Sequence, residues 1–207
     1  MILPEDPRRL NNKFSLETIE AHVKGYTEAL SGALLSIDWR QLELAIAEIE
    51  SVRTRRGRLW VAGNGGSAAI ADHLLCDWVK GTFTQSRSPI HVHSLVSDTA
   101  LLTACANDFG YETAFSRQLE MKAQSGDVLI CISSSGNSPN ILAAMRAAGS
   151  MGLRTIAFTG FSGGEAAKMA DISLHIAAHN YGVVEDCHQI LMHNMAQYIY
   201  GRSAGGV

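Results

Sequence analysis

The sequence has few cysteines, no long apolar run and no excess of basic residues. Its four cysteines, Cys76, Cys105, Cys131 and Cys187, include no CxxC pair, which argues against a disulfide framework and favours reduced thiols in the cytoplasm. No apolar segment approaches roughly 20 residues, and the start MILPEDPRRL does not resemble a signal peptide, so neither membrane insertion nor secretion is expected. A net charge of −3 excludes a broad basic surface for nucleic acid.

With 207 residues and 46% hydrophobic content, the chain is long enough for one well-buried domain, and we take residues 1–207 as one. Apolar residues at three- and four-residue spacing predict a helical extension over about residues 15–55. From about residue 56 to residue 200, β-rich runs alternate with helical segments. The β-rich runs are 58–63, 89–96, 127–133, 154–160 and 171–177. This alternation predicts an α/β fold with a doubly wound, five-stranded parallel sheet buried on both faces.

Two loops at strand ends have the composition of a phosphate site. In Gly63–Ser67, three glycines permit close approach of the backbone to a ligand, and Ser67 can cap the next helix. In Ser133–Ser138, four hydroxyls precede a helix that opens at Pro139. Ligands of open parallel sheets bind where such loops meet helix N-termini. A dinucleotide site is disfavoured, because no acidic residue ends the second strand, where Ser97 precedes Asp98.

Titratable side chains gather on two of the predicted helices. His73 and Asp77 stand four residues apart and share a helix face. On the last helix, Glu185 and His193 stand eight residues apart, about 80° in azimuth and roughly two turns in height, so they can face the same way. Together the four can hold a divalent metal or supply a general base and a general acid to a carbohydrate.

Four segments, in this order and spacing, resemble the phosphoheptose isomerase branch of the sugar-isomerase (SIS) family. They are GNGGSAAIADH, TACANDFGYE, GDVLICISSSGNSPN, and FTGFSGG followed by ADI. The resemblance covers about residues 15–200. It implies a flavodoxin-like sheet, a homotetramer, and isomerisation of sedoheptulose 7-phosphate to a manno-heptose 7-phosphate.

The resemblance also assigns roles to individual residues. It implies phosphate binding by Ser133, Ser134, Ser135 and Ser138, and sugar contacts from Asn64, Gly65, Gly66, Ser67, Asn107 and Asp108. His73, Asp77, Glu185 and His193 fall where the family has His, Glu, Gln and His, the set that binds zinc in some members. Asp77, Glu185 and His193 are the catalytic candidates within that set. Compared with the family, the longer acidic side chain is therefore on the last predicted helix, at Glu185, and the shorter one is at Asp77. This exchange can preserve the reach of the carboxylates across the site.

Two other functions fit the same loops. A sugar-phosphate sensor needs the serine loop but no base, and some similar proteins are tetrameric partners of the replication initiator. The carboxylate at Asp77 and the imidazole at His193 favour the enzyme.

Overall fold

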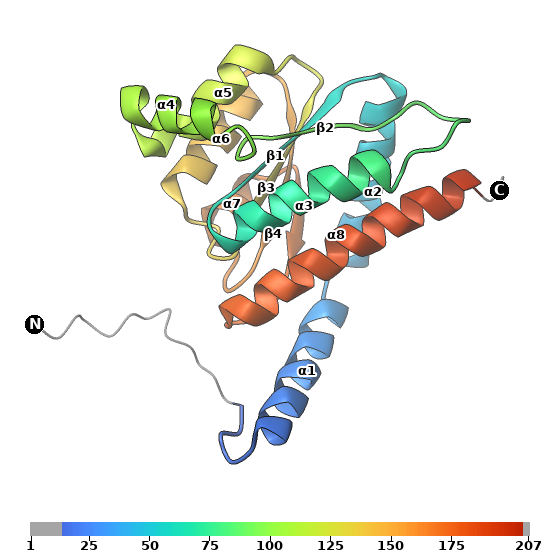
Figure 1. The fold of residues 1–207 in the computed structure, drawn as a ribbon, viewed down its shortest axis with the longest axis vertical. Helices are drawn as coiled ribbons and strands as arrows, with labels where there is room; N and C mark the ends of the chain where they lie inside the picture. Colours follow the sequence, from blue (N-terminus) through green and yellow to red (C-terminus); the bar gives the residue numbers. More distant parts are fainter. Residues whose placement is uncertain (1–13, 205–207) are drawn as a thin grey trace, which may run out of the picture.

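The five predicted strands form the centre of the molecule (Figure 1). The computed structural model describes residues 14–204; residues 1–13 and 205–207, which the expected domain limits include, lie outside the described residues. The strands are β1 (Arg58–Gly63), β2 (His91–Ser94), β3 (Val128–Ser133), β4 (Arg154–Thr159) and β5 (Ile172–His175). All pairs are parallel, in the order β2-β1-β3-β4-β5. This order is that of the flavodoxin-like fold and confirms the expected architecture.

Helices cover both faces of the sheet, because side chains of each strand alternate between two apolar cores. In β1, Leu59 and Val61 enter one core, whereas Trp60 and Ala62 enter the other. The first core is closed by α1 (Ile19–Leu35), α2 (Trp39–Thr54), α3 (Gly66–Lys80) and α8 (Tyr181–Ala204). The second is closed by α4 (Thr99–Phe109), α5 (Ala114–Lys122), α6 (Pro139–Ser150) and α7 (Gly164–Met169).

Two local features differ from the sequence-based expectation, and a third was not anticipated. The third is the short 3₁₀ turn η1 (Tyr111–Thr113) between α4 and α5, which follows Gly110, where φ is 86° and α4 ends in a conformation that favours glycine. Strand β2 keeps only four of the eight residues expected. Ser67 lies inside α3, so the helix begins at Gly66 without a side-chain cap.

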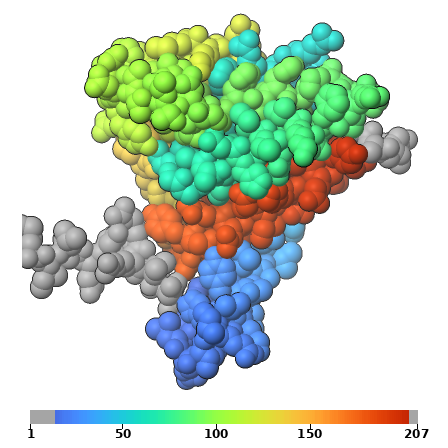
Figure 2. All heavy atoms as spheres, viewed as in Figure 1, coloured from blue at the N-terminus to red at the C-terminus, as the bar shows by residue number. Residues whose placement is uncertain are grey.

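Helix α1 projects from the body of the molecule (Figures 1 and 2). Its N-terminus is capped by Thr18, whose hydroxyl accepts a hydrogen bond from the Ala21 amide. Tyr26 ties the helix to α8 by donating to Asp186 Oδ2 at 2.6 Å. Ile19 and Val23 are exposed, which leaves an apolar stripe without a partner in the described chain. None of the described helices combines the length and apolar character that a membrane span requires.

Candidate functional site

The loop from β1 into α3 depends on glycine for its shape. Gly65 has φ +55°, where side chains other than glycine are strained. A Cβ on Gly63 would collide with the Ser67 backbone, so the turn closes only with glycine there. Ser67, an expected sugar contact, is buried and donates its amide to the Asn64 carbonyl at 3.0 Å. The loop therefore presents mainly the backbone of Gly65 and Gly66.

Asn64 connects this loop to the rest of the site. Its amide exchanges two hydrogen bonds with the amide of Asn140, at 2.8 and 2.9 Å, and its Oδ1 also accepts from the Tyr111 hydroxyl at 2.7 Å. Asn140 is buried in the first turn of α6, directly after the serine loop. Asn64 thus holds the two loops and the end of α4 together, and one amide hydrogen remains for a ligand.

The loop from β3 into α6 carries the predicted hydroxyls. Ser133 and Ser134 are buried, and Ser134 Oγ has no hydrogen-bond partner among the described residues. Ser138 is the N-cap residue of α6, yet its side chain makes no capping bond. Gly136 has φ +65°, and a Cβ there would collide with the Gly163 carbonyl, so the loop packs directly on the β4–α7 turn. Unpaired hydroxyls and a helix N-terminus make this loop suited to an anion.

Asn107 and Asp108 lie exposed in the last turn of α4. The amide of Asn107 donates to Asp108 Oδ1 at 2.9 Å. Tyr111, three residues further on, reaches Asn64, so this end of α4 adjoins the first loop.

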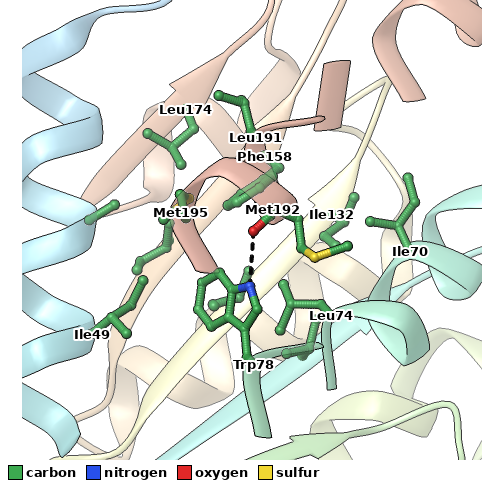
Figure 3. Packing of buried hydrophobic residues seen from close by; sticks show 14 of the residues in the cluster. Ile49, Ile70, Leu74, Trp78, Ile132, Phe158, Leu174, Leu191, Met192 and Met195 are labelled. Atoms are coloured by element: carbon green, nitrogen blue, oxygen red, sulfur yellow. Dashed lines mark hydrogen bonds between the residues drawn. The ribbon is translucent and has the colours of Figure 1, made fainter. Parts of the chain in front are cut away.

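Helices α3 and α8 lie side by side and run in the same direction (Figure 1). The Trp78 indole, fully buried among side chains of both helices, donates to the Met192 carbonyl at 3.1 Å (Figure 3). Trp78 follows Asp77, and Met192 precedes His193. This buried bond therefore fixes the height at which Asp77 and His193 meet.

The structure brings three of the four predicted metal-site residues together. Asp77 Oδ2 lies 3.1 Å from His193 Nε2, and Asp77 Oδ1 lies 3.5 Å from His73 Nε2. One ligand atom from each of the three residues lies within 4.8 Å of the others. Two imidazoles and a carboxylate are ligands that zinc accepts, so the residues fit a divalent metal. His73 is 48% exposed, which excludes a packed core histidine.

Gln189 is the member of this cluster that sequence reasoning missed. Its side-chain amide lies 2.7 Å from His73 Nδ1 and 3.2 Å from His193 Nε2. The available signal was its spacing, since Gln189 and His193 stand four residues apart on α8, as His73 and Asp77 do on α3.

Glu185 lies on α8, two turns before His193, and its carboxylate faces the start of α3. Its carboxylate occupies the space that a Cβ on Gly66 would fill. Partial burial, and secondarily the nearby Asp186 carboxylate, raise the pKa of Glu185 above its ordinary value. The raised pKa favours the protonated form of this carboxyl group relative to an ordinary glutamate. His188, between Glu185 and His193 in sequence, points instead into the core, where its Nε2 donates to the Thr159 carbonyl at 3.2 Å.

Comparison with known proteins identifies the family. The SIS domain profile matches residues 25–160. The chain is 40% identical to the phosphoheptose isomerase of Roseiflexus sp. over 158 residues, 75% of this chain and 79% of the relative. It is 36% identical to the probable phosphoheptose isomerase of Thermoplasma acidophilum over 176 residues, 85% and 96% of the two chains. The solved phosphoheptose isomerase from Neisseria gonorrhoeae superposes with a TM-score of 0.79 at 30% identity, covering 87% of this chain and 96% of that one. The chain belongs to the SIS-domain family and, within it, to the phosphoheptose isomerases.

Proposed function

We propose that this protein converts sedoheptulose 7-phosphate to a manno-heptose 7-phosphate by proton transfer between C1 and C2. The observation that carries the proposal is the contact between Asp77 on α3 and His193 on α8. Near the start of the same two helices, the Glu185 carboxylate lies against Gly66 of the first loop. A base, an acid and an anion-binding loop are the parts that this reaction needs. The family relationship supplies the substrate class.

The serine loop would anchor the phosphate. Ser134 Oγ is buried and without a partner in the described chain, and Ser138 leaves the N-terminus of α6 uncapped by its side chain. The hydroxyls of Ser133 and Ser135 would donate further hydrogen bonds to the same phosphate. Hydrogen bonds to a charged group are stronger than those between neutral groups, which suits a group that binds without reacting.

The carbon end of the sugar would lie along α3 and α8. The Asp77 carboxylate takes the C1 proton while His193 donates a proton to O2, which gives an enediol. Return of the carbon-bound proton to C2, and removal of the O1 proton by His193, complete the aldose. Glu185, whose carboxylate lies against Gly66, would be close to a sugar bound at the first loop and would assist the transfer of these protons. Asn64, Gly65, Gly66, Ser67, Asn107 and Asp108 would position the hydroxyls.

A divalent metal, zinc or another, would be held by His73, Asp77 and His193, with Glu185 the fourth residue that the family pattern indicates. When bound, such an ion polarises the oxygens at the reacting carbons and favours the enediol charge.

We also propose that the protein acts as a homotetramer in the cytoplasm. A groove of ≈ 1290 Å³ runs between α2 and α8, lined by apolar side chains that include Leu35, Trp39 and Leu191. The exposed stripe of α1, with Ile19 and Val23, matches this groove in character, and it projects away from its own chain (Figure 2). The four cysteines are free thiols, three of them buried, in keeping with a reducing compartment.

The experiment is to incubate the purified protein with sedoheptulose 7-phosphate and follow the sugar by NMR. An aldose phosphate should form with the native protein and not with Asp77→Asn, which keeps the size of the side chain but removes the base. Binding of the ketose phosphate without conversion would overturn the proposal in favour of a sugar-phosphate-binding protein.

A further inference from the structure

Three side chains from separate segments, Asn64, Tyr111 and Asn140, form one hydrogen-bonded group beside the first loop. They belong to the β1–α3 loop, the turn η1 and the first turn of α6. We propose that Tyr111 and Asn140 are positioning residues, which hold the side-chain amide of Asn64 in the one orientation that offers the sugar a hydrogen-bond donor. That the sugar meets Asn64 rests on the proposed function, but the positioning role is tested by binding, without turnover.

The orientation of the group is set by a backbone amide, which can only donate. The Ile141 N–H donates to Asn140 Oδ1 at 3.0 Å. Ile141 is the third residue of α6, so no carbonyl within the helix accepts this N–H, and the residue is fully buried. If the Asn140 amide were turned over, its NH2 group would face the Ile141 N–H and leave a buried donor unpaired. The oxygen of Asn140 therefore stays on this side.

The Asn140 amide in turn fixes the Asn64 amide. Asn140 Oδ1 accepts a hydrogen bond from Asn64 Nδ2 at 2.8 Å, and Asn140 Nδ2 donates to Asn64 Oδ1 at 2.9 Å. If Asn64 alone were turned over, oxygen would face oxygen and NH2 would face NH2, so both bonds would be lost. Because Asn140 is buried, its own polar atoms would then lack partners as well.

Tyr111 completes the group from the surface. Its hydroxyl donates to Asn64 Oδ1 at 2.7 Å, although its side chain is 54% exposed. The carboxamide oxygen of Asn64 has two lone pairs, and the bonds from Asn140 and Tyr111 use both. One N–H of Asn64 is bonded to Asn140, so a single N–H remains. Asn64 can therefore act on a ligand only as a donor.

A fixed donor at this place selects an oxygen that accepts a hydrogen bond. Asn64 is half-buried beside the exposed backbone of Gly65 and Gly66, so a ligand on the first loop can reach its amide. A donor that is already oriented costs little when the sugar binds. Without the Tyr111 hydroxyl, Asn140 alone would hold the amide, and part of this preorganisation would be lost.

The test is a double-mutant cycle, measured by calorimetric titration with sedoheptulose 7-phosphate. Tyr111→Phe should weaken binding by about threefold to tenfold, the loss expected for one hydrogen bond. The same substitution made in Asn64→Ala or in Asn64→Ser should change the affinity by less than about twofold, because Tyr111 acts through Asn64. The second background guards against misfolding of the first. Tyr200→Phe is the matched control, since it removes a hydroxyl from a ring that is 45% exposed near the end of α8, and it should bind as native protein does.

An equal loss on Tyr111→Phe with and without the Asn64 side chain would overturn the assignment, because Tyr111 would then act on the sugar or on the fold directly. Native affinity in folded Tyr111→Phe would overturn it too. Native protein that does not bind sedoheptulose 7-phosphate would remove this assignment and the proposed function together. Turnover, measured on the same preparations, separates the two otherwise. Conversion with additive losses leaves the isomerase and removes the positioning role, whereas binding with non-additive losses and no conversion does the reverse.

Discussion

Lengthening Asp77 to glutamate tests whether its short carboxylate is fitted to this site or is a damaged remnant of a longer one. Asp77 Oδ2 already lies 3.1 Å from His193 Nε2, and Oδ1 lies 3.5 Å from His73 Nε2. One more methylene extends the side chain by about 1.5 Å, which would leave about 1.6 Å of the first separation and force the carboxylate aside. The aspartate thus has the reach that the described geometry requires.

We therefore expect Asp77→Glu to reduce kcat by about 100-fold, the usual effect of misplacing a reacting group by about 1 Å, equivalent to about 2.7 kcal/mol in the barrier. KM should change little, because the phosphate anchor is untouched. Asp77→Asn is the companion variant and should lose about 10²- to 10⁴-fold, as expected when a general base is removed. Steady-state kinetics with sedoheptulose 7-phosphate measures both. An inactive native protein that becomes active as Asp77→Glu would refute this reasoning and identify a decayed site.

Three further predictions concern the anchor, the core and the assembly. Ser135→Ala with Ser138→Ala should weaken sugar-phosphate binding by about 3–6 kcal/mol, because two hydrogen bonds to a charged group are lost; unchanged affinity by calorimetry would exclude the loop as the phosphate site. Burial lowers the pKa of His188 to about 4, below its ordinary 6.5, so the unfolded chain binds the proton first as the pH falls. Because of this group, the free energy of unfolding should fall by about 3 kcal/mol between pH 6.5 and pH 4 and should not change above pH 6.5. Urea unfolding of His188→Gln should lack this pH-dependent loss, and a pH profile identical to that of the native protein would contradict the prediction. Light scattering should give about four chain masses for native protein and fewer for Trp39→Asp in the groove. Phe83→Asp, equally exposed at 55% but outside the groove, should not change the mass. A monomeric native protein would exclude the tetramer.

Much of the fold could be predicted because its signals are local. Continuous apolar runs such as DVLICIS marked the buried strands, and Pro139 marked the start of α6. The details that were wrong depend on backbone angles that the sequence does not display. Gly110 ends α4 at positive φ and is followed by the 3₁₀ turn η1, and Ser67 lies inside α3 because Gly65 takes the cap position.

The site was only partly predictable, because its residues meet through tertiary packing. The pair of His73 and Asp77 followed from their spacing on one helix. Their meeting with His193 depends on the relative height of α3 and α8, which the buried Trp78–Met192 bond sets. Gln189 was missed for that reason. The role of Asn64 was likewise not visible, since its partner Asn140 lies 76 residues away.

The central claim, that the protein moves a proton between C1 and C2 of a heptose phosphate, is tested most directly in deuterium oxide. Native protein is incubated with sedoheptulose 7-phosphate, and the products are followed by proton and deuterium NMR. The proton that Asp77 removes from C1 can exchange with deuterium from the solvent before it is returned to C2, because Asp77 is partly exposed. The account predicts an aldose 7-phosphate that carries deuterium at C2. A spectrum that remains that of the ketose, although the sugar phosphate binds, would contradict it.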